Sequence, residues 1–239
     1  MNTHRHFSTR PLYLQVRDAL VQKYAGTDAP PGALPNEESL AREYGVSPGT
    51  VRKALTTLVN ERVLTRRPGR GTFISDPASG ELAIRFSNIR SSDGQRVSGS
   101  VAKSTIEIGL ANEAEREQLN LHANAQVFRI KRVRHDQGHP FMVEDVALPA
   151  AIFPDLDKRP DRSHRVTLLA RQYGILLGKA TEKLRLAAAS PDIATALEVA
   201  PESPVLVLDR LVLALDSRPV EWRIGYCYLG DKQYVADMS

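Results

Sequence analysis

Basic side chains gather in two short stretches of the first third of this sequence. One stretch holds Thr50, Arg52 and Lys53, and the other places four arginines within nine residues. These four are Arg62, Arg66, Arg67 and Arg70. Guanidinium and ammonium groups pair with phosphate oxygens, and arginine or lysine can also donate to the guanine edge in a major groove. The combination indicates contact with nucleic acid.

A second pair of arginines lies in an apolar setting. Period-two alternation places Arg132 and Arg134 on a strand face that otherwise carries apolar side chains. A charged group on a half-buried face needs a partner. That partner is either a bound anion or an internal carboxylate such as Glu144 or Glu182, and the sequence leaves both open.

Charge is unevenly distributed along the chain, whose formal net charge is +4. Residues 1–76 hold 11 Lys and Arg against 7 Asp and Glu, whereas residues 77–239 hold 21 of each sign. All of the excess positive charge therefore lies in the first third. A solvated basic surface is the simpler explanation of most charge runs, but this clustering is typical of a DNA-contacting face.

Length, hydropathy and cysteine content restrict the class of protein. The 239 residues, 42% of them hydrophobic, are enough for two packed domains. We find no apolar run of about 18 residues that could span a bilayer, and the amino terminus lacks the apolar core of a secretory signal. We therefore expect a soluble, cytoplasmic protein with no membrane partner. The single cysteine, Cys227, is predicted to be a buried structural thiol.

Cofactor and metal motifs were sought along the whole sequence. His135 and His139 flank a glycine in a predicted turn, so they lack the spacing of a zinc set. The sequence also shows no phosphate-binding loop, dinucleotide glycine pattern or nucleophile elbow. We predict neither a metal nor a cofactor.

Helix signals surround the first basic stretch. A packing helix starts at Pro11, with Arg17 expected on its solvent side. Asn36 suits the N-cap of a second helix, Gly45 permits a turn, and Ser47 suits the N-cap of a third. The third helix buries Val51, Ala54, Leu55 and Leu58. Its first residues are left to enter a DNA groove, although the same turn also occurs in purely structural helical hairpins.

The second basic stretch lies in a predicted hairpin. Residues 64–67 and 71–74 have the composition of two short strands, with Pro68, Gly69 and Arg70 at the tip. A tip of small residues lets the backbone approach DNA closely, and the arginines can contact phosphates or enter the minor groove.

Residues 11–75 resemble the winged helix-turn-helix of the GntR family of bacterial transcription regulators. The resemblance rests on Pro11-Leu12-Tyr13, Leu34 to Glu37, Gly45-Val46-Ser47, Thr50-Val51-Arg52 and Gly69-x-Gly71-Thr72-Phe73. It implies that Thr50, Arg52 and the wing around Gly69 contact DNA. The predicted DNA-binding residues are Ser47, Thr50, Arg52, Lys53, Arg66, Arg67, Gly69, Arg70 and Gly71.

Some positions depart from the pattern of that family. Pro48, which Gly49 follows, stands where many members place an arginine, and Glu38 stands where some carry a basic residue. Base reading is therefore expected to depend more on Arg52 and Lys53, or to shift to the wing.

The rest of the chain contains an internal duplication. Arg132 is echoed by Arg210 at an offset of 78 residues, and Pro140 by Pro219 at an offset of 79. Each copy predicts a helix end followed by a β-hairpin, so we expect an antiparallel sheet with helices on one face and a cleft on the other face or between the two halves. The predicted fold class is α+β. The predicted domains are a DNA-binding domain at 1–76, a linker at 77–83 and an effector-binding and dimerisation domain at 84–239.

Residues 84–235 resemble the UTRA ligand-sensing domain of the HutC-like branch of the same family, whose fold is similar to chorismate lyase. The resemblance rests on Phe86-Ser87, Val127 through Arg132-x-Arg134, Pro140 through Leu148-Pro149, Tyr173-Gly174 and Pro219-Val220-Glu221. It implies that Arg132, Arg134, Glu144 and Thr167 line a pocket for a small anionic effector. We add Tyr226 as a side chain that could reach this pocket.

These observations together predict a transcription factor, most simply a repressor. It would bind double-stranded operator DNA as a homodimer and respond to a small anionic metabolite. Two alternatives remain at this point: a chorismate-lyase-like enzyme acting on a small anionic substrate, and a DNA-coating protein with no sequence preference.

Overall fold

The computed structural model divides into two compact units, residues 1–76 and 77–239. The structure describes residues 10–24, 33–61, 63–74, 86–97, 99–159 and 165–236. The proposed linker at 77–83 lies outside these residues, as does Arg62. Within the described part of the chain, no helix is both long and apolar enough to cross a membrane.

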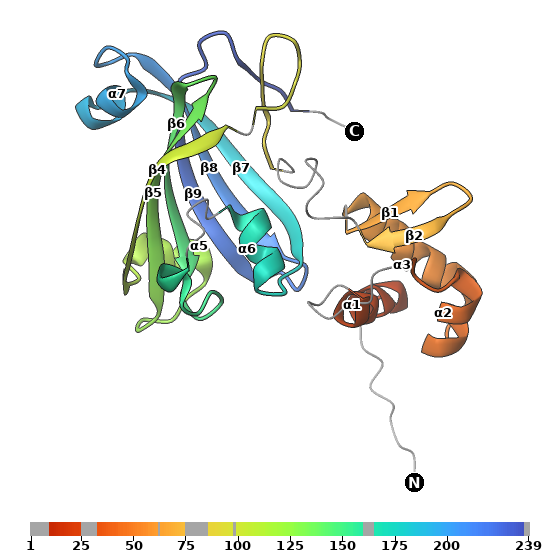
Figure 1. Ribbon diagram of the computed structural model, residues 1–239. Helices are drawn as coiled ribbons and strands as arrows, with labels where there is room; N and C mark the ends of the chain where they lie inside the picture. The colour runs from red at the N-terminus through yellow and green to blue at the C-terminus, as the bar shows by residue number, and fades with distance from the viewer. Residues whose placement is uncertain are drawn as a thin grey trace. The chain divides into compact units, whose positions relative to one another are not determined.

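In the described residues of the first unit, three helices are followed by a two-stranded antiparallel sheet (Figure 1). The helices are α1 (Leu12–Tyr24), α2 (Glu37–Tyr44) and α3 (Pro48–Asn60), and the strands are β1 (Leu64–Arg67) and β2 (Gly71–Ile74). Leu34 N–H donates to the carbonyl oxygen of Thr72 at 2.7 Å, which ties the wing to the segment before α2. The winged helix-turn-helix expected from the sequence is confirmed.

Capping residues define the turn between α2 and α3. The Asn36 side chain accepts a hydrogen bond from the backbone N–H of Ser39 at 2.8 Å, and that of Ser47 accepts from the N–H of Thr50 at 3.2 Å. Gly45 ends α2 in the left-handed region, at φ 63°. These contacts satisfy N–H groups that the first turn of a helix leaves without partners.

The core of the first unit contains one residue that the sequence placed incorrectly. The predicted apolar face of α3 is buried, but Arg17, which we expected in solvent, is only 7% exposed. Its Nη1 donates to Oε1 of Glu61 at 2.8 Å, just past the end of α3. Because α1 packs on α3, the arginine stem is covered while its charge reaches a carboxylate.

The second unit is built on a six-stranded antiparallel sheet with the strand order β4-β5-β6-β9-β8-β7 (Figure 1). The strands are β4 (Ser100–Leu110), β5 (Gln126–Asp136), β6 (His139–Pro149), β7 (Leu177–Ala188), β8 (Pro204–Ala214) and β9 (Pro219–Cys227). The helices are α5 (Glu113–Leu119), α6 (Val166–Gln172), α7 (Pro191–Leu197) and the short 3-10 helix η1 (Leu156–Lys158). A separate two-stranded sheet joins β3 (Ile89–Arg90) to β10 (Gln233–Tyr234). The fold class is α+β, as predicted.

The sheet contains two copies of one unit, β4-α5-β5-β6 and β7-α7-β8-β9, which meet where β6 pairs with β9. Asn112 caps α5 and Ser190 caps α7 at equivalent positions, and both helices end in a left-handed residue. The sequence indicated the helix and hairpin of each copy but missed the long first strands. β4 and β7 are the edge strands, and their many exposed polar residues weaken the apolar alternation of a strand.

Side chains alternate along each strand, so the six-stranded sheet has two faces with different neighbours. One face packs against α5 and α7, through clusters that include Leu119 with Val127 and Leu197 with Val205. The opposite face packs against α6 and the segment 86–97. The expectation that all helices lie on one face is therefore wrong for α6, which lies on the face that carries the arginines of β5.

Cys227 is a buried thiol, as predicted from the sequence. It is 0% exposed and belongs to a cluster that includes Ile89 and Val97 of the segment 86–97. Burial raises the pKa of this thiol to about 12, so it is unreactive in the folded protein.

Candidate nucleic-acid interface and effector cavity

The start of α3 presents a pair of hydroxyl groups. Ser47 Oγ and Thr50 Oγ1 lie 2.9 Å apart and share a hydrogen bond, so the N-cap also orients the threonine. Pro48 and Gly49 between them are exposed and bring no side-chain donor. The polar reading groups at this end of the helix are therefore the hydroxyls and the two basic residues that follow.

Each of those basic residues has a contact within the unit. Arg52 Nε donates to Oε2 of Glu37 at 2.8 Å, although the arginine side chain is 66% exposed. The ammonium group of Lys53 lies 4.2 Å from the centroid of the Tyr13 ring, a cation–π arrangement. Both side chains keep their charge on the solvent side of α3.

The wing carries its arginines on an exposed hairpin. Arg66 Nη2 donates to the Thr56 hydroxyl of α3 at 3.2 Å, and the Arg67 guanidinium lies 4.8 Å from the Phe73 ring centroid. Gly69 and Gly71 have φ values of 69° and 108°, a region that side chains rarely adopt. We call α3 residues 47–53 and wing residues 66–71 the reading surface.

A cavity of about 40 Å³ lies on the other unit, between the sheet, the start of α6 and the segment 86–97. It holds water-sized molecules but is far smaller than the roughly 300–1,000 Å³ of typical ligand pockets. Five arginines and one carboxyl group are among its described lining residues, namely Arg132, Arg134, Arg165, Arg210, Arg223 and Glu221. We call this the effector cavity.

Glu144 of β6 joins three of the cavity arginines. Its carboxylate is 2.5 Å from Nε of Arg132, 2.6 Å from Nη1 of Arg223 and 3.6 Å from Nη1 of Arg134. Burial alone would raise the pKa of Glu144, but the three guanidinium groups outweigh it and hold this pKa far below its ordinary value. The carboxylate is therefore charged at neutral pH.

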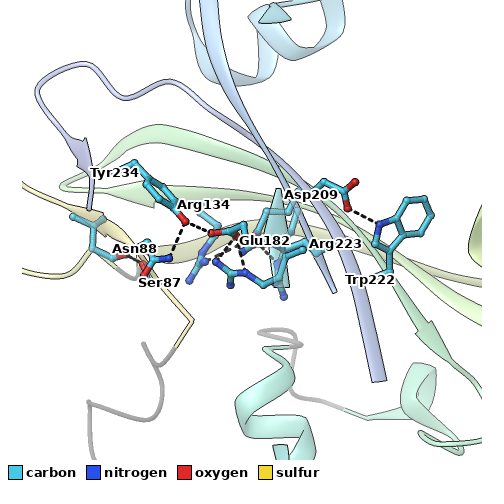
Figure 2. Close-up of polar contacts among 12 residues, drawn as sticks. Ser87, Asn88, Arg134, Glu182, Asp209, Trp222, Arg223 and Tyr234 are labelled. Carbon is cyan, nitrogen blue, oxygen red and sulfur yellow. Dashed lines mark hydrogen bonds and ion pairs between the residues drawn. The ribbon is translucent and has the colours of Figure 1, made fainter. Parts of the chain in front are cut away.

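Glu182 of β7 forms the centre of a second cluster (Figure 2). Its carboxylate is 2.6 Å from Nη2 of Arg210 and 3.1 Å from Nη2 of Arg223. The Tyr234 hydroxyl donates to Oε2 of Glu182 at 2.7 Å and accepts from Nδ2 of Asn88 at 2.8 Å, as Figure 2 shows. This chain of contacts connects the sheet to β10 and to the segment that covers the cavity.

Polar atoms without a hydrogen-bond partner among the described residues also lie on the cavity wall. They include Nε of Arg134, Oγ1 of Thr167 and Oε2 of Glu221. Burial lowers the pKa of Arg134 to about 10, so the guanidinium stays charged at neutral pH. Burial also raises the pKa of Glu221, which favours its neutral form. The cavity can thus offer a cationic donor, a hydroxyl and a carboxyl group to a bound molecule.

Sequence comparison assigns both units. The profile for bacterial regulatory proteins of the gntR family matches residues 12–74, and the UTRA domain profile matches residues 99–232. The chain belongs to the GntR family. As a GntR-family protein with a UTRA domain, it is a DNA-binding transcriptional regulator and not an enzyme.

Bacterial relatives support this assignment over most of the chain. The HTH-type transcriptional regulator Rv0792c of Mycobacterium tuberculosis is 32% identical over 88% of this chain and 80% of its own length. The mannosyl-D-glycerate transport/metabolism system repressor MngR of Escherichia coli is 25% identical over 93% of this chain and 87% of its own. The repressor NagR of Bacillus subtilis is 29% identical over 84% and 83%.

Solved structures share the fold of this GntR-family chain. The ligand-binding domain of a GntR-family regulator from Bordetella bronchiseptica has a TM-score of 0.58 and 26% identity, and covers 65% of this chain and 98% of its own. PhnF of Mycobacterium smegmatis has a TM-score of 0.55 and 21% identity, and covers 95% and 99%. The second match shows a common fold only.

The UTRA domain brings together most of the effector residues expected from the sequence. Arg132, Arg134 and Thr167 line the cavity, whereas Glu144 is 0% exposed and holds the arginines in place. Arg132 therefore has an internal carboxylate partner, which was the alternative left open above. The prediction that Tyr226 reaches the cavity is wrong. Side chains alternate along β9, so Arg223 points toward the cavity, whereas Tyr226 lies on the opposite face and packs against α7.

Among the charged cavity residues of the UTRA domain, Arg165, which precedes α6, was missed, and so were three residues of the second copy of the duplication. Arg210, Glu221 and Arg223 come from the second copy of the duplication, on β8 and β9. A signal for Arg210 was present, because it is the duplicate of Arg132. Placing the others requires the strand pairing in which Arg210 lies opposite Arg223 and Glu182.

Proposed function

We propose that this regulator is a repressor whose operator affinity is controlled by a small anionic metabolite bound in the effector cavity. MngR and NagR are both named repressors, and both align with more than four fifths of this chain. The reading surface would contact operator DNA in a cytoplasmic setting. The predicted DNA contacts are Ser47, Thr50, Arg52, Lys53, Arg66, Arg67, Gly69, Arg70 and Gly71.

The effector proposal rests above all on the incomplete pairing of Arg134. Its ion pair with the Glu144 carboxylate is 3.6 Å long, and its Nε has no hydrogen-bond partner among the described residues. A buried guanidinium favours an additional negative partner. An anionic group of the ligand would bind Arg134 and the Thr167 hydroxyl, while Glu221 would accept or donate a hydrogen bond at a hydroxyl or amino group.

The size of the cavity supports a conformational response. A metabolite does not fit in about 40 Å³, so binding would require the covering segment or α6 to move. The covering segment, residues 86–97, follows the proposed linker along the chain. Its displacement would change the placement of the DNA-binding heads, which in a homodimer must engage half-sites about one helical turn apart.

A two-part experiment tests this function. The full-length protein is first used to select duplexes from a random pool, and its Kd is compared between a selected and a scrambled duplex. Thermal-shift screening of sugar phosphates, carboxylates and phosphonates then identifies ligands, whose effect on the first Kd is measured. We expect a clear sequence preference that an anionic ligand weakens. Equal affinity for both duplexes would contradict the proposal.

A further inference from the structure

One carboxylate connects the elements of the reading surface. Glu37, the first residue of α2, accepts from Arg52 Nε of α3 at 2.8 Å through Oε2. Its other oxygen, Oε1, lies 3.8 Å from Arg66 Nη2 of the wing. The same Arg66 nitrogen donates to Thr56 of α3 at 3.2 Å. The recognition helix, the helix before it and the wing therefore meet at Glu37.

The geometry leaves the two Nη groups of Arg52 available to donate hydrogen bonds to DNA. Glu37 is bound at Nε, and the two Nη groups, which have no partner among the described residues, remain at the exposed end of the side chain. Two parallel donors match the O6 and N7 acceptors of guanine in the major groove. A long exposed arginine otherwise samples many rotamers, and fixing one of them reduces the entropy lost on binding DNA.

The residues around Arg52 leave few other side chains at the start of α3 that could donate to a base edge. Pro48 and Gly49 supply no side-chain donor at the start of α3, and Lys53 lies over the Tyr13 ring. Arg52 is thus the arginine of α3 that can read a base edge with two donors.

Two simpler explanations of Glu37 do not account for these contacts. Acidic residues are favoured in the first turn of a helix, but Glu38 satisfies that preference equally and makes no hydrogen bond or ion pair with the described residues. An exposed ion pair also adds little to folding stability. In addition, a carboxylate beside a phosphate backbone opposes binding, so its presence on this surface calls for a function in the complex.

We infer that Glu37 is a positioning residue that orients Arg52 for base reading and holds Arg66 of the wing beside it. This inference rests on the proposed contact between the reading surface and DNA. Sequence discrimination, rather than total affinity, depends on this carboxylate. Loss of Glu37 removes a negative charge near DNA and raises affinity for any duplex, while it lowers the preference for the selected one.

The test compares full-length variants on the selected and scrambled duplexes at one salt concentration. The variants are Glu37→Ala, Glu37→Gln, Glu38→Ala, Arg52→Ala and the double variant of Glu37→Ala with Arg52→Ala. The measured quantity is the specificity ratio, the Kd for the scrambled duplex divided by that for the selected one. Glu38→Ala is the matched control because it removes the same charge from the adjacent exposed position.

We expect Glu37→Ala to lower the specificity ratio about tenfold, as the loss of one oriented bidentate base contact would. Glu38→Ala should strengthen binding to both duplexes and leave the ratio unchanged. Glu37→Gln should lie between the wild type and Glu37→Ala, because its amide oxygen can still accept from Nε. In the Arg52→Ala background, Glu37→Ala should cause no further fall.

Two outcomes would overturn the inference alone. One is a wild-type ratio well above one that Glu37→Ala leaves unchanged, and the other is an equal fall with and without Arg52, which would mean a structural effect. Thermal midpoints of all variants, with Glu37→Gln as the milder change, separate misfolding from lost reading. A wild-type ratio of one would instead overturn the proposed function together with this inference.

Discussion

The arginines of the reading surface and those of the effector cavity are the same residue type in opposite surroundings. Arg52 and Arg66 keep 66% and 45% of their side chains in water, whereas Arg132 and Arg223 keep 4% each. In water a guanidinium needs little compensation, because solvent already stabilises its charge. In the cavity a buried charge needs a partner, and Glu144 and Glu182 provide one for Arg132, Arg210 and Arg223.

This contrast suits two kinds of anion. A DNA backbone is a long polyanion that displaces counterions from exposed cations, so its binding depends strongly on salt. A small metabolite must be selected from many others, which requires fixed donors in a site that excludes water. The predictions below test how far the two sets of arginines differ, beginning with the largest effect.

Glu144→Gln should destabilise the UTRA domain by about 3–5 kcal/mol, because it leaves buried guanidinium groups without their shared counter-charge. The measurement is urea unfolding of the full-length protein, followed by tryptophan fluorescence. The chain has one tryptophan, Trp222, which lies on β9, so the signal reports this unit. Glu117→Gln, at an exposed position of α5, is the control and should change the free energy of unfolding by less than about 1 kcal/mol.

Glu144 should also govern stability in acid. The pKa of Glu144 is lower in the folded than in the unfolded state. Its contribution to folding stability is therefore complete above a pH of about 4.3, the pKa in the unfolded state, and is lost as the pH falls toward the folded-state pKa. The free energy of unfolding of the wild type should therefore decrease more steeply below pH of about 4 than that of Glu144→Gln. Parallel pH profiles would show that Glu144 does not control this loss.

Arg134→Met should weaken binding of the anionic ligand found by thermal shift about 10- to 100-fold, since one charge-assisted hydrogen bond is lost. Calorimetric titration provides the measurement. Arg185→Met is the matched control because it removes an exposed arginine from β7 with the same change in net charge. If both variants lost affinity equally, the effect would be one of overall charge and not of the cavity.

Arg67→Ala should weaken binding to selected and scrambled duplexes alike, by about fivefold at moderate salt, because a phosphate contact carries no sequence information. The slope of log K against log salt concentration should fall by about one unit. Arg185→Ala in the other unit serves as the control. An unchanged slope for Arg67→Ala would argue against a phosphate contact.

Tyr234→Phe should cost about 1 kcal/mol of UTRA-domain stability, because Glu182 loses a buried donor and Asn88 loses its acceptor. Tyr228→Phe is the control, since its ring is 38% exposed. Urea unfolding followed by Trp222 fluorescence measures both variants. Equal midpoints for the wild type and Tyr234→Phe would mean that the contacts in Figure 2 add nothing to stability.

The helices and turn that carry the reading surface could be predicted from sequence, because their signals are local. Asn36, Gly45 and Ser47 define the ends of α2 and α3 within a span of 12 residues. What could not be predicted was the pairing of the basic side chains within the unit. Arg17 with Glu61 and Arg52 with Glu37 are separated by 44 and 15 residues, and no local pattern records such contacts.

The effector cavity could be predicted only in part, because strand register brings its residues together. Arg223 reaches Glu144 across 79 residues of sequence. The β5 half was predicted because Arg132 and Arg134 interrupt an apolar face. The edge strands β4 and β7 were not predicted, because their exposed polar residues weaken the apolar alternation of a strand. Tyr226 was assigned to the wrong face because no β9 residue had yet been placed relative to the cavity.

Cys227 offers a natural reporter of motion in the UTRA domain. Its side chain belongs to the same buried cluster as Ile89 and Val97, which lie in the segment that also lines the cavity. A thiol-specific reagent can modify this side chain only when the cluster opens, so the modification rate reports opening events in an otherwise unaltered protein. A metabolite that holds the segment in one position would change the rate of Cys227 modification, so ligand binding could be followed without a mutation or an added label.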